Sequence, residues 1–129
     1  MEKYLIDTNI FLEILLEQEK KEKCKSFLVE NYGKLVLSDF SLHSIGVILF
    51  RNHKYSLYNS FINDVIPNIK VASIEKNRYY RLEELAVRFN LDFDDSFQAV
   101  LAEDLKLTVV TMDKDFERIK KHIKIKFLN

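Results

Sequence analysis

Five short apolar runs recur along the chain, separated by longer stretches of mixed character. The runs are KYLID at 3–7, KLVLS at 34–38, KVASI at 70–74, LTVVT at 107–111 and IKIKFL at 123–128. The first four are mostly continuous rather than alternating, which is typical of strands that are covered on both faces. We therefore predict five β-strands, of which the first four are buried between other layers.

The stretches between these runs repeat their hydrophobic positions with the period of an α-helix. Such patterns cover 9–32 in two pieces, 42–66 in two more, and 76–105 with a break near Asn90. Strands that alternate with helices predict a parallel sheet with helices on both faces. The expected fold class is α/β, with three α/β/α layers around a central parallel five-stranded sheet.

The break near Asn90 lies in the sequence FNLDFDDSF, where one helix stops and another begins. Asp92 is placed to cap the second helix, with Asp95 three residues further on, as in a variant of the capping box. Positions 95, 98, 99 and 102 share one face of that helix and read Asp, Gln, Ala and Ala. Small residues on this face allow the helix to approach a neighbour closely.

The composition fits a single compact domain over 1–129. The chain has 129 residues, of which 47% are hydrophobic and 31% charged, with two glycines and one proline. This length buries roughly two-thirds of the unfolded surface. No change in composition suggests a linker or a second domain.

Cysteine content and apolar run length indicate the compartment. The single cysteine, Cys24, excludes an internal disulfide and any CxxC motif. No apolar run approaches the roughly 20 residues that cross a bilayer, and the first residues lack the pattern of a signal peptide. We expect a cytoplasmic protein that is not associated with a membrane.

The charges balance, with 20 basic and 20 acidic residues. The chain therefore lacks the strongly basic character of many nucleic-acid-binding proteins. This balance does not exclude an enzyme with an acidic centre and a basic rim, because the local field can differ in sign from the total charge.

Three aspartates stand where a parallel sheet gathers its ligands. Asp7 ends the first predicted strand, Asp113 follows the fourth, and Asp95 begins the helix that leads into the fourth. Ligands of open parallel sheets bind outside the carboxyl ends of the strands. If the first and fourth strands are neighbours, these carboxylates converge at one edge.

Crowded carboxylates repel one another unless a cation neutralises them. Hard oxygen ligands suit Mg²⁺ or Mn²⁺, which retain water molecules and bridge to phosphate oxygens. The chemistry that such a site favours is phosphodiester hydrolysis by a metal-activated water.

Each acid also has a simpler interpretation. Asp7 alone could cap a helix that begins near Asn9, and one carboxylate oxygen can cap while the other binds metal. Asp113 and Asp115 could begin a turn or cap the next helix. Asp94 could be a solvated charge at a helix start, since negative charge there complements the helix dipole.

Two segments, LIDTNIFL and DDSFQAVLAEDLKLTVVTMDKDF, stand in a chain with five alternating strands. Together these features resemble the PIN domain, a small metal-dependent ribonuclease fold found in the toxins of VapBC-type toxin–antitoxin pairs. This resemblance implies an RNA substrate, a cognate antitoxin protein as partner, a homodimer, and Mg²⁺ or Mn²⁺ as cofactor.

The resemblance also implies roles for individual residues. Asp7, Asp95 and Asp113 match the family's metal ligands and thus its catalytic residues. Thr8 and Asn9 match the polar pair that supports the first ligand, and Thr111 matches the hydroxyl residue that shapes the site. Asp94 and Asp115 are adjacent alternatives as ligands, and the DSFQA spacing favours Asp95 over Asp94.

The chain departs from the family pattern on the helix after the second strand. The family carries a glutamate near His43 or Ser44, and here 41–73 contains no acid except Asp64. His43 or Ser44 could ligate in its place, or Asp39 could reach in from the strand end, although a histidine near an apolar helix face is more often a hydrogen-bonded core or rim residue than a ligand. The alternative to an active ribonuclease is a PIN-like scaffold that binds RNA or a partner protein without cutting.

Overall fold

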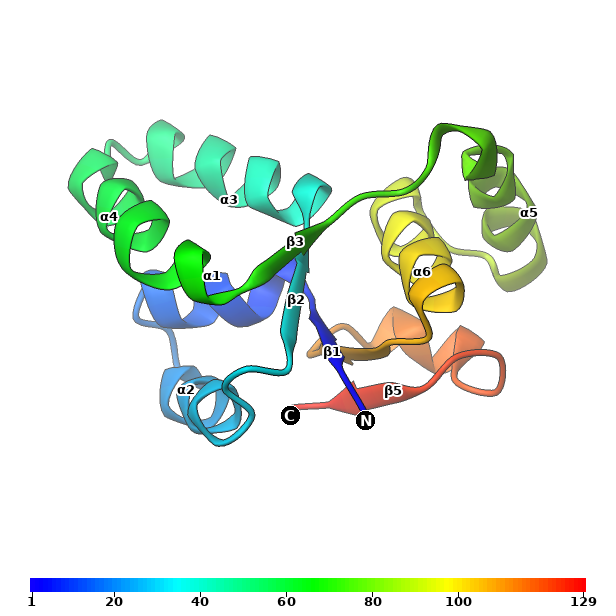
Figure 1. The fold of residues 1–129 in the computed structure, drawn as a ribbon, viewed down its shortest axis with the longest axis horizontal. Helices are drawn as coiled ribbons and strands as arrows, with labels where there is room; N and C mark the ends of the chain where they lie inside the picture. Colours follow the sequence, from blue (N-terminus) through cyan, green and yellow to red (C-terminus); the bar gives the residue numbers. More distant parts are fainter.

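The computed structural model describes residues 1–129 and contains one sheet of five parallel strands (Figure 1). The strands are β1 (Tyr4–Ile6), β2 (Leu35–Ser38), β3 (Lys70–Ala72), β4 (Thr108–Thr111) and β5 (Ile125–Phe127). Their order is β3-β2-β1-β4-β5, and every pairing is parallel. The predicted parallel five-stranded α/β sheet is confirmed, and the first and fourth strands are neighbours.

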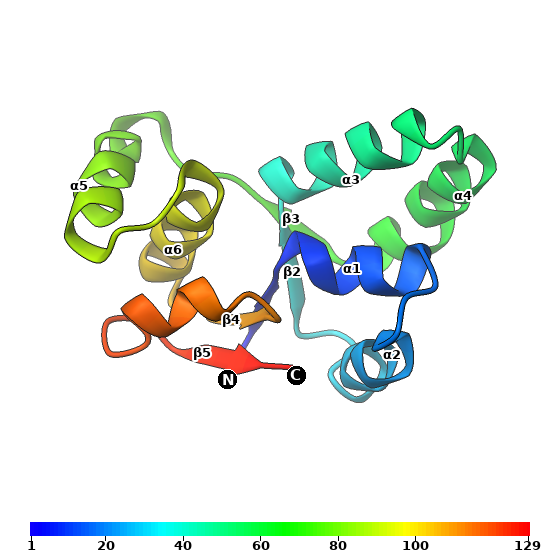
Figure 2. The same cartoon turned by 180° about the vertical axis from the view of Figure 1, so that it is seen from behind.

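Helices cover both faces of this sheet. On one side lie α1 (Thr8–Leu15), α2 (Lys21–Glu30), α3 (Asp39–Arg51) and α4 (Tyr55–Ser60), and on the other lie α5 (Tyr80–Phe89) and α6 (Phe93–Leu105) (Figures 1 and 2). The short helical segments are Phe61–Val65, Ile66–Asn68, Lys76–Arg78 and Lys114–Ile119.

The alternation of side chains along each strand builds two cores, one for each face. Leu5 and Val109 belong to the core shared with α5 and α6. The next residue along each strand, Ile6 or Val110, belongs to the core shared with α1, α2 and α3. Because both faces are buried, the central strands read as continuous apolar runs rather than alternating ones.

The structure differs from the sequence prediction at two elements. β3 is not covered on both faces, because it is an edge strand whose Lys70 and Val71 are exposed. The helix α3 begins at Asp39 rather than Leu42, because the Ser38 hydroxyl accepts a hydrogen bond of 2.9 Å from the backbone N–H of Ser41 and caps the helix early.

The predicted break between the last two helices is confirmed. Asn90 ends α5 in the left-handed conformation with φ of 55°. The Asp92 carboxylate then caps α6 by accepting a 2.8 Å hydrogen bond from the backbone N–H of Asp95. This cap fixes where the Asp95 side chain emerges from the helix.

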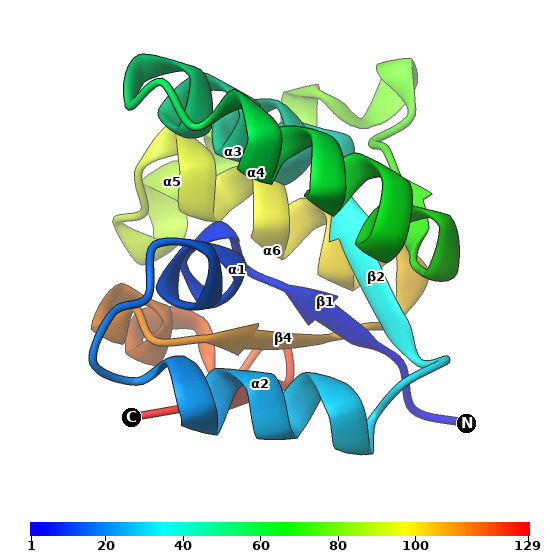
Figure 3. The ribbon, with the colours of Figure 1, turned by 90° about the vertical axis from the view of Figure 1, so that its left-hand side faces the viewer.

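The topology brings the carboxyl ends of β1 and β4 to the same edge of the sheet. β1 lies between β2 and β4 and leads directly into α1 (Figure 3). The carboxyl ends of β1 and β4 therefore lie side by side. None of the helices is long and apolar enough to cross a membrane.

Candidate metal centre

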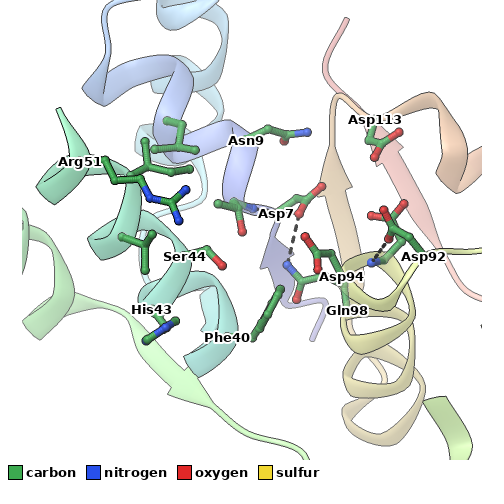
Figure 4. Close-up of a pocket in the computed structure, with 15 residues that line it drawn as sticks. Asp7, Asn9, Phe40, His43, Ser44, Arg51, Asp92, Asp94, Gln98 and Asp113 are labelled. Atoms are coloured by element: carbon green, nitrogen blue, oxygen red, sulfur yellow. Dashed lines mark hydrogen bonds between the residues drawn. The ribbon is translucent and has the colours of Figure 1, made fainter. Parts of the chain in front are cut away.

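A pocket of about 390 Å³ opens at this edge of the sheet (Figure 4). Asp7 comes from the end of β1, Asp95 from the first turn of α6, and Asp113 from the residues after β4. These are the three acids that the sequence predicts to converge, and all three line the pocket. α3 forms the facing side (Figure 4).

A compact acidic cluster occupies one part of this region. One carboxylate oxygen from each of Asp95, Asp113 and Asp115 lies within 4.8 Å of the others. Asp95 is buried, whereas Asp113 and Asp115 are half-buried. Asp115 also forms an ion pair of 3.3 Å with Arg118. The tightest group therefore includes Asp115, which the sequence offered only as an alternative, and does not include Asp7.

Asp7 is held in place by three hydrogen-bond donors. Its Oδ1 accepts from the backbone N–H of Thr8 at 2.9 Å and from the Gln98 amide at 3.2 Å, and its Oδ2 accepts from the Thr111 hydroxyl at 2.7 Å. A carboxylate has about four lone-pair positions. Asp7 therefore caps α1, as its simpler interpretation predicts, and retains capacity for one further contact.

The Thr111 hydroxyl joins the two strand ends of the site. While it donates to Asp7, it accepts a 2.9 Å hydrogen bond from the backbone N–H of Asp113. The Asp113 Oδ1 in turn accepts from the backbone N–H of Asp115 at 2.9 Å and caps the short helical segment that follows. Thr111 thereby fixes Asp113 relative to Asp7, consistent with the supporting role expected for it.

The electrostatics of the cluster favour a bound cation. Burial, together with the charges of Asp113, Asp92, Asp7 and Asp115, raises the pKa of Asp95 to about 8. Burial also raises the pKa of Asp7, although its hydrogen bonds to Thr111 and Gln98 oppose that shift. Without a positive partner, these carboxylates are costly to keep ionised at neutral pH.

Three buried side-chain oxygens at the pocket have no hydrogen-bond partner. Oδ2 of Asp95 is buried and has no hydrogen-bond partner, and the same is true of the side-chain oxygens of Asn9 and Gln98. All three atoms are acceptors and all three residues line the pocket. Acceptors that lack donors, next to clustered carboxylates, fit a hard divalent cation with its water molecules.

A network of neutral side chains lies beneath the acids, and the sequence did not reveal its role. The Gln98 amide donates to both Asp7 and the Ser41 hydroxyl, the latter at 2.8 Å, and Thr8 donates to the same hydroxyl at 2.8 Å. These bonds tie α1, α3 and α6 together. Gln98 shares a helix face with Asp95, and the other residues of that face are small. A lone amide in this position is the sequence signal for the network.

The side of the pocket formed by α3 carries no acid. His43 and Ser44 line it, His43 exposed and Ser44 half-buried. Asp39 does not line this pocket, because its carboxylate accepts hydrogen bonds of 2.8 Å from the backbone N–H of Phe40 and from the Ser73 hydroxyl. Asp94 lines the rim but is exposed and outside the compact cluster.

The amino-acid sequence of the chain matches the model of a known protein family. The model for the PIN domain matches residues 4–122, which is most of the chain. The chain belongs to the PIN domain family. The acidic residues predicted from the strand ends thus lie within a recognised PIN domain.

Solved structures support the same fold at low sequence identity. A toxin–antitoxin complex from Klebsiella pneumoniae matches with a TM-score of 0.79 and 18% identity, covering 98% of each chain. VapBC2 from Rickettsia felis, bound to a promoter DNA fragment, matches with a TM-score of 0.80 and 16% identity over 98% of each chain.

The toxin VapC20 of Mycobacterium tuberculosis, described as cleaving the sarcin–ricin loop, is a further structural neighbour. It matches with a TM-score of 0.77 and 13% identity, covering 89% of this PIN domain and 93% of its own chain. No curated protein sequence matches the chain. These neighbours are similar to this chain in fold.

Proposed function

We propose that this PIN domain is a Mg²⁺- or Mn²⁺-dependent endoribonuclease of the VapC type that hydrolyses RNA phosphodiester bonds. The acidic cluster carries this proposal, because Asp95, Asp113 and Asp115 approach within 4.8 Å and Oδ2 of Asp95 has no partner. Aspartate is the most frequent residue type in the lining of the pocket.

In this proposal Asp95 and Asp113 are ligands of the cation, and Asp115 is the nearest third carboxylate. Asp7 faces the same pocket and uses its remaining lone pair toward the cation or its hydration shell. When bound, the cation lowers the pKa of water and offsets negative charge on the phosphate oxygens. Thr111 and Gln98 keep the carboxylate of Asp7 oriented.

The partner class follows from the neighbours. Toxin–antitoxin complexes are among the structures of similar fold, so we propose a small antitoxin protein as a partner of this chain. We further propose a cytoplasmic homodimer that acts on RNA. Sedimentation of the purified chain, with and without the product of an adjacent reading frame, tests these two assemblies.

The second candidate function is a PIN-like scaffold that binds RNA or a partner without cutting. The α3 side of the pocket favours it, because His43 and Ser44 stand where the family carries a glutamate. Fewer carboxylates bind a cation more weakly, since ligand charge is one factor that tunes affinity. The two candidates differ in whether bound metal leads to cleavage.

Calorimetric titration of Mn²⁺ into the purified protein tests the site, together with an RNA cleavage assay. We expect one binding event at micromolar to millimolar Mn²⁺ and a loss of cleavage in Asp7→Asn. Undiminished cleavage by Asp7→Asn would remove Asp7 from the site. Metal binding without cleavage would favour the scaffold, and absence of Mn²⁺ binding at millimolar concentration would contradict the metal centre.

A further inference from the structure

One face of α3 forms the side of the pocket across from the acids. Its lining residues recur every three or four positions, as one helix face requires, and are Phe40, His43, Ser44, Val47, Ile48 and Arg51. We call these six residues the α3 wall. None of them is acidic, and Arg51 carries a permanent positive charge.

Arg51 is the one arginine with neither an acidic partner nor an aromatic ring beneath its guanidinium. Arg78 and Arg81 form ion pairs with Glu103, and Arg118 pairs with Asp115. Arg88 lies over the ring of Phe89. No ion pair of the structure includes Arg51, which is exposed at the pocket.

The guanidinium of Arg51 points from the end of α3 into the pocket, facing the side from which the aspartates project (Figure 4). The two sides of the pocket therefore carry opposite charges. One side attracts cations through its carboxylates, and the other attracts anions through a guanidinium that no carboxylate neutralises. A ligand with several phosphates along a flexible backbone satisfies both sides at once, because one phosphate can lie at the cation and a neighbouring one at Arg51.

We propose that Arg51 binds a backbone phosphate of single-stranded RNA next to the phosphate at the acidic cluster. Guanidinium groups bind phosphate through paired hydrogen bonds, which fix orientation as well as position. The α3 wall thereby sets the path of the strand across the pocket. A carboxylate on this wall would repel the same phosphate, so the absence of the family glutamate favours this contact. This inference rests on the proposed function, since it places RNA in the pocket.

Fluorescence anisotropy of a labelled single-stranded RNA tests the contact separately from cleavage. The titration is made with Ca²⁺ in the buffer, across salt concentrations, for the wild type, Arg51→Ala and Arg51→Lys. Arg88→Ala is the matched control, because Arg88 is an arginine on α5 that does not line the pocket. Cleavage in Mn²⁺ is measured in parallel with the same four proteins.

We expect Arg51→Ala to weaken RNA binding by about tenfold, because a hydrogen bond to a charged group is lost. The slope of log affinity against log salt should decrease by about 0.7, the value for one phosphate contact on a single strand. Arg51→Lys should retain most of that slope, since it keeps the charge, and Arg88→Ala should bind like the wild type.

Equal RNA affinity and equal salt slopes for Arg51→Ala and the wild type would overturn the inference and leave the proposed ribonuclease intact if both proteins cleave. Equal losses in Arg51→Ala and Arg88→Ala would also overturn it, because the effect would then be non-specific. RNA binding that depends on Arg51, without cleavage by the wild type in Mn²⁺, would support the inference and contradict the proposed activity.

Discussion

Replacing Asp95 with asparagine should stabilise the protein when metal is absent. In the folded protein without metal, the pKa of Asp95 is about 8, whereas an aspartate in an unfolded chain titrates near 3.9. Between these values the folded state holds a proton that the unfolded state has released. The free energy of unfolding of the wild type therefore falls, relative to a variant without this group, by about 1.4 kcal/mol for each unit of rising pH.

Asparagine cannot ionise, so Asp95→Asn avoids this loss. From pH 4 to pH 7 the variant gains about 4 kcal/mol in free energy of unfolding relative to the wild type, and this is the upper limit that the raised pKa allows. The expected result is near-equal stability of variant and wild type at pH 4 and a variant that is more stable by at least about 1 kcal/mol at pH 7. Urea unfolding in EDTA, followed by circular dichroism at both pH values, measures this difference.

Divalent metal should reduce the stability advantage of Asp95→Asn over the wild type. Mn²⁺ at a hundred times its Kd stabilises a folded protein by about 2.7 kcal/mol, and this gain should be reduced in Asp95→Asn, which lacks a charged ligand. Asp94→Asn is the matched control, because Asp94 is the adjacent acid, exposed and outside the compact cluster. A variant that is no more stable than the wild type at pH 7 in EDTA, or that gains equally from Mn²⁺, would refute this reasoning.

Three further predictions concern the surroundings of the site. Ser44→Glu adds a carboxylate to the α3 side, so Mn²⁺ should bind more tightly by calorimetry; unchanged or weaker binding would show that this position does not face the cation. Gln98→Leu removes a buried donor from Asp7, so Mn²⁺ affinity should fall by about tenfold, with Val100→Ala as a core control that lowers stability alone. Far from the pocket, hydrogen bonds from Arg81 and His122 lower the pKa of Glu103 to about 2, so Glu103→Gln should cost about 1 to 2 kcal/mol in urea unfolding at pH 7. That cost should shrink as the pH falls from about 4.5 toward 2, where the wild type loses the same stabilisation, and a cost independent of pH would contradict the assignment.

The convergence of Asp7, Asp95 and Asp113 was predictable because it depends on topology alone. Each acid stands at the end of an element whose type the hydrophobic pattern reveals, and parallel strands bring those ends to one edge. The cap at Asp92 was predictable for a similar reason, since capping depends on residues three positions apart.

Other features of the site depend on side-chain placement that no local pattern encodes. Asp115 reaches the cluster because the residues after β4 form a short helical turn capped by Asp113. Asp39 turns away from the pocket because the hydroxyl of Ser73, which follows β3 and is remote in sequence, donates a hydrogen bond to its carboxylate. The Gln98 network joins positions up to 91 residues apart, so only the folded chain shows it.

Cleavage of single-stranded RNA by the purified protein, with Mn²⁺ and with EDTA, tests whether the acidic cluster is the site of a metal-dependent ribonuclease. The matched comparison is Asp113→Asn, which keeps the shape of the side chain and removes one charge from the acidic cluster. We predict cleavage by the wild type that requires Mn²⁺ and falls about a hundredfold or more in the variant, since even loss of a partner of a metal ligand costs tenfold to a hundredfold in affinity or activity. Equal rates in EDTA and Mn²⁺, or equal rates for variant and wild type, would contradict this prediction.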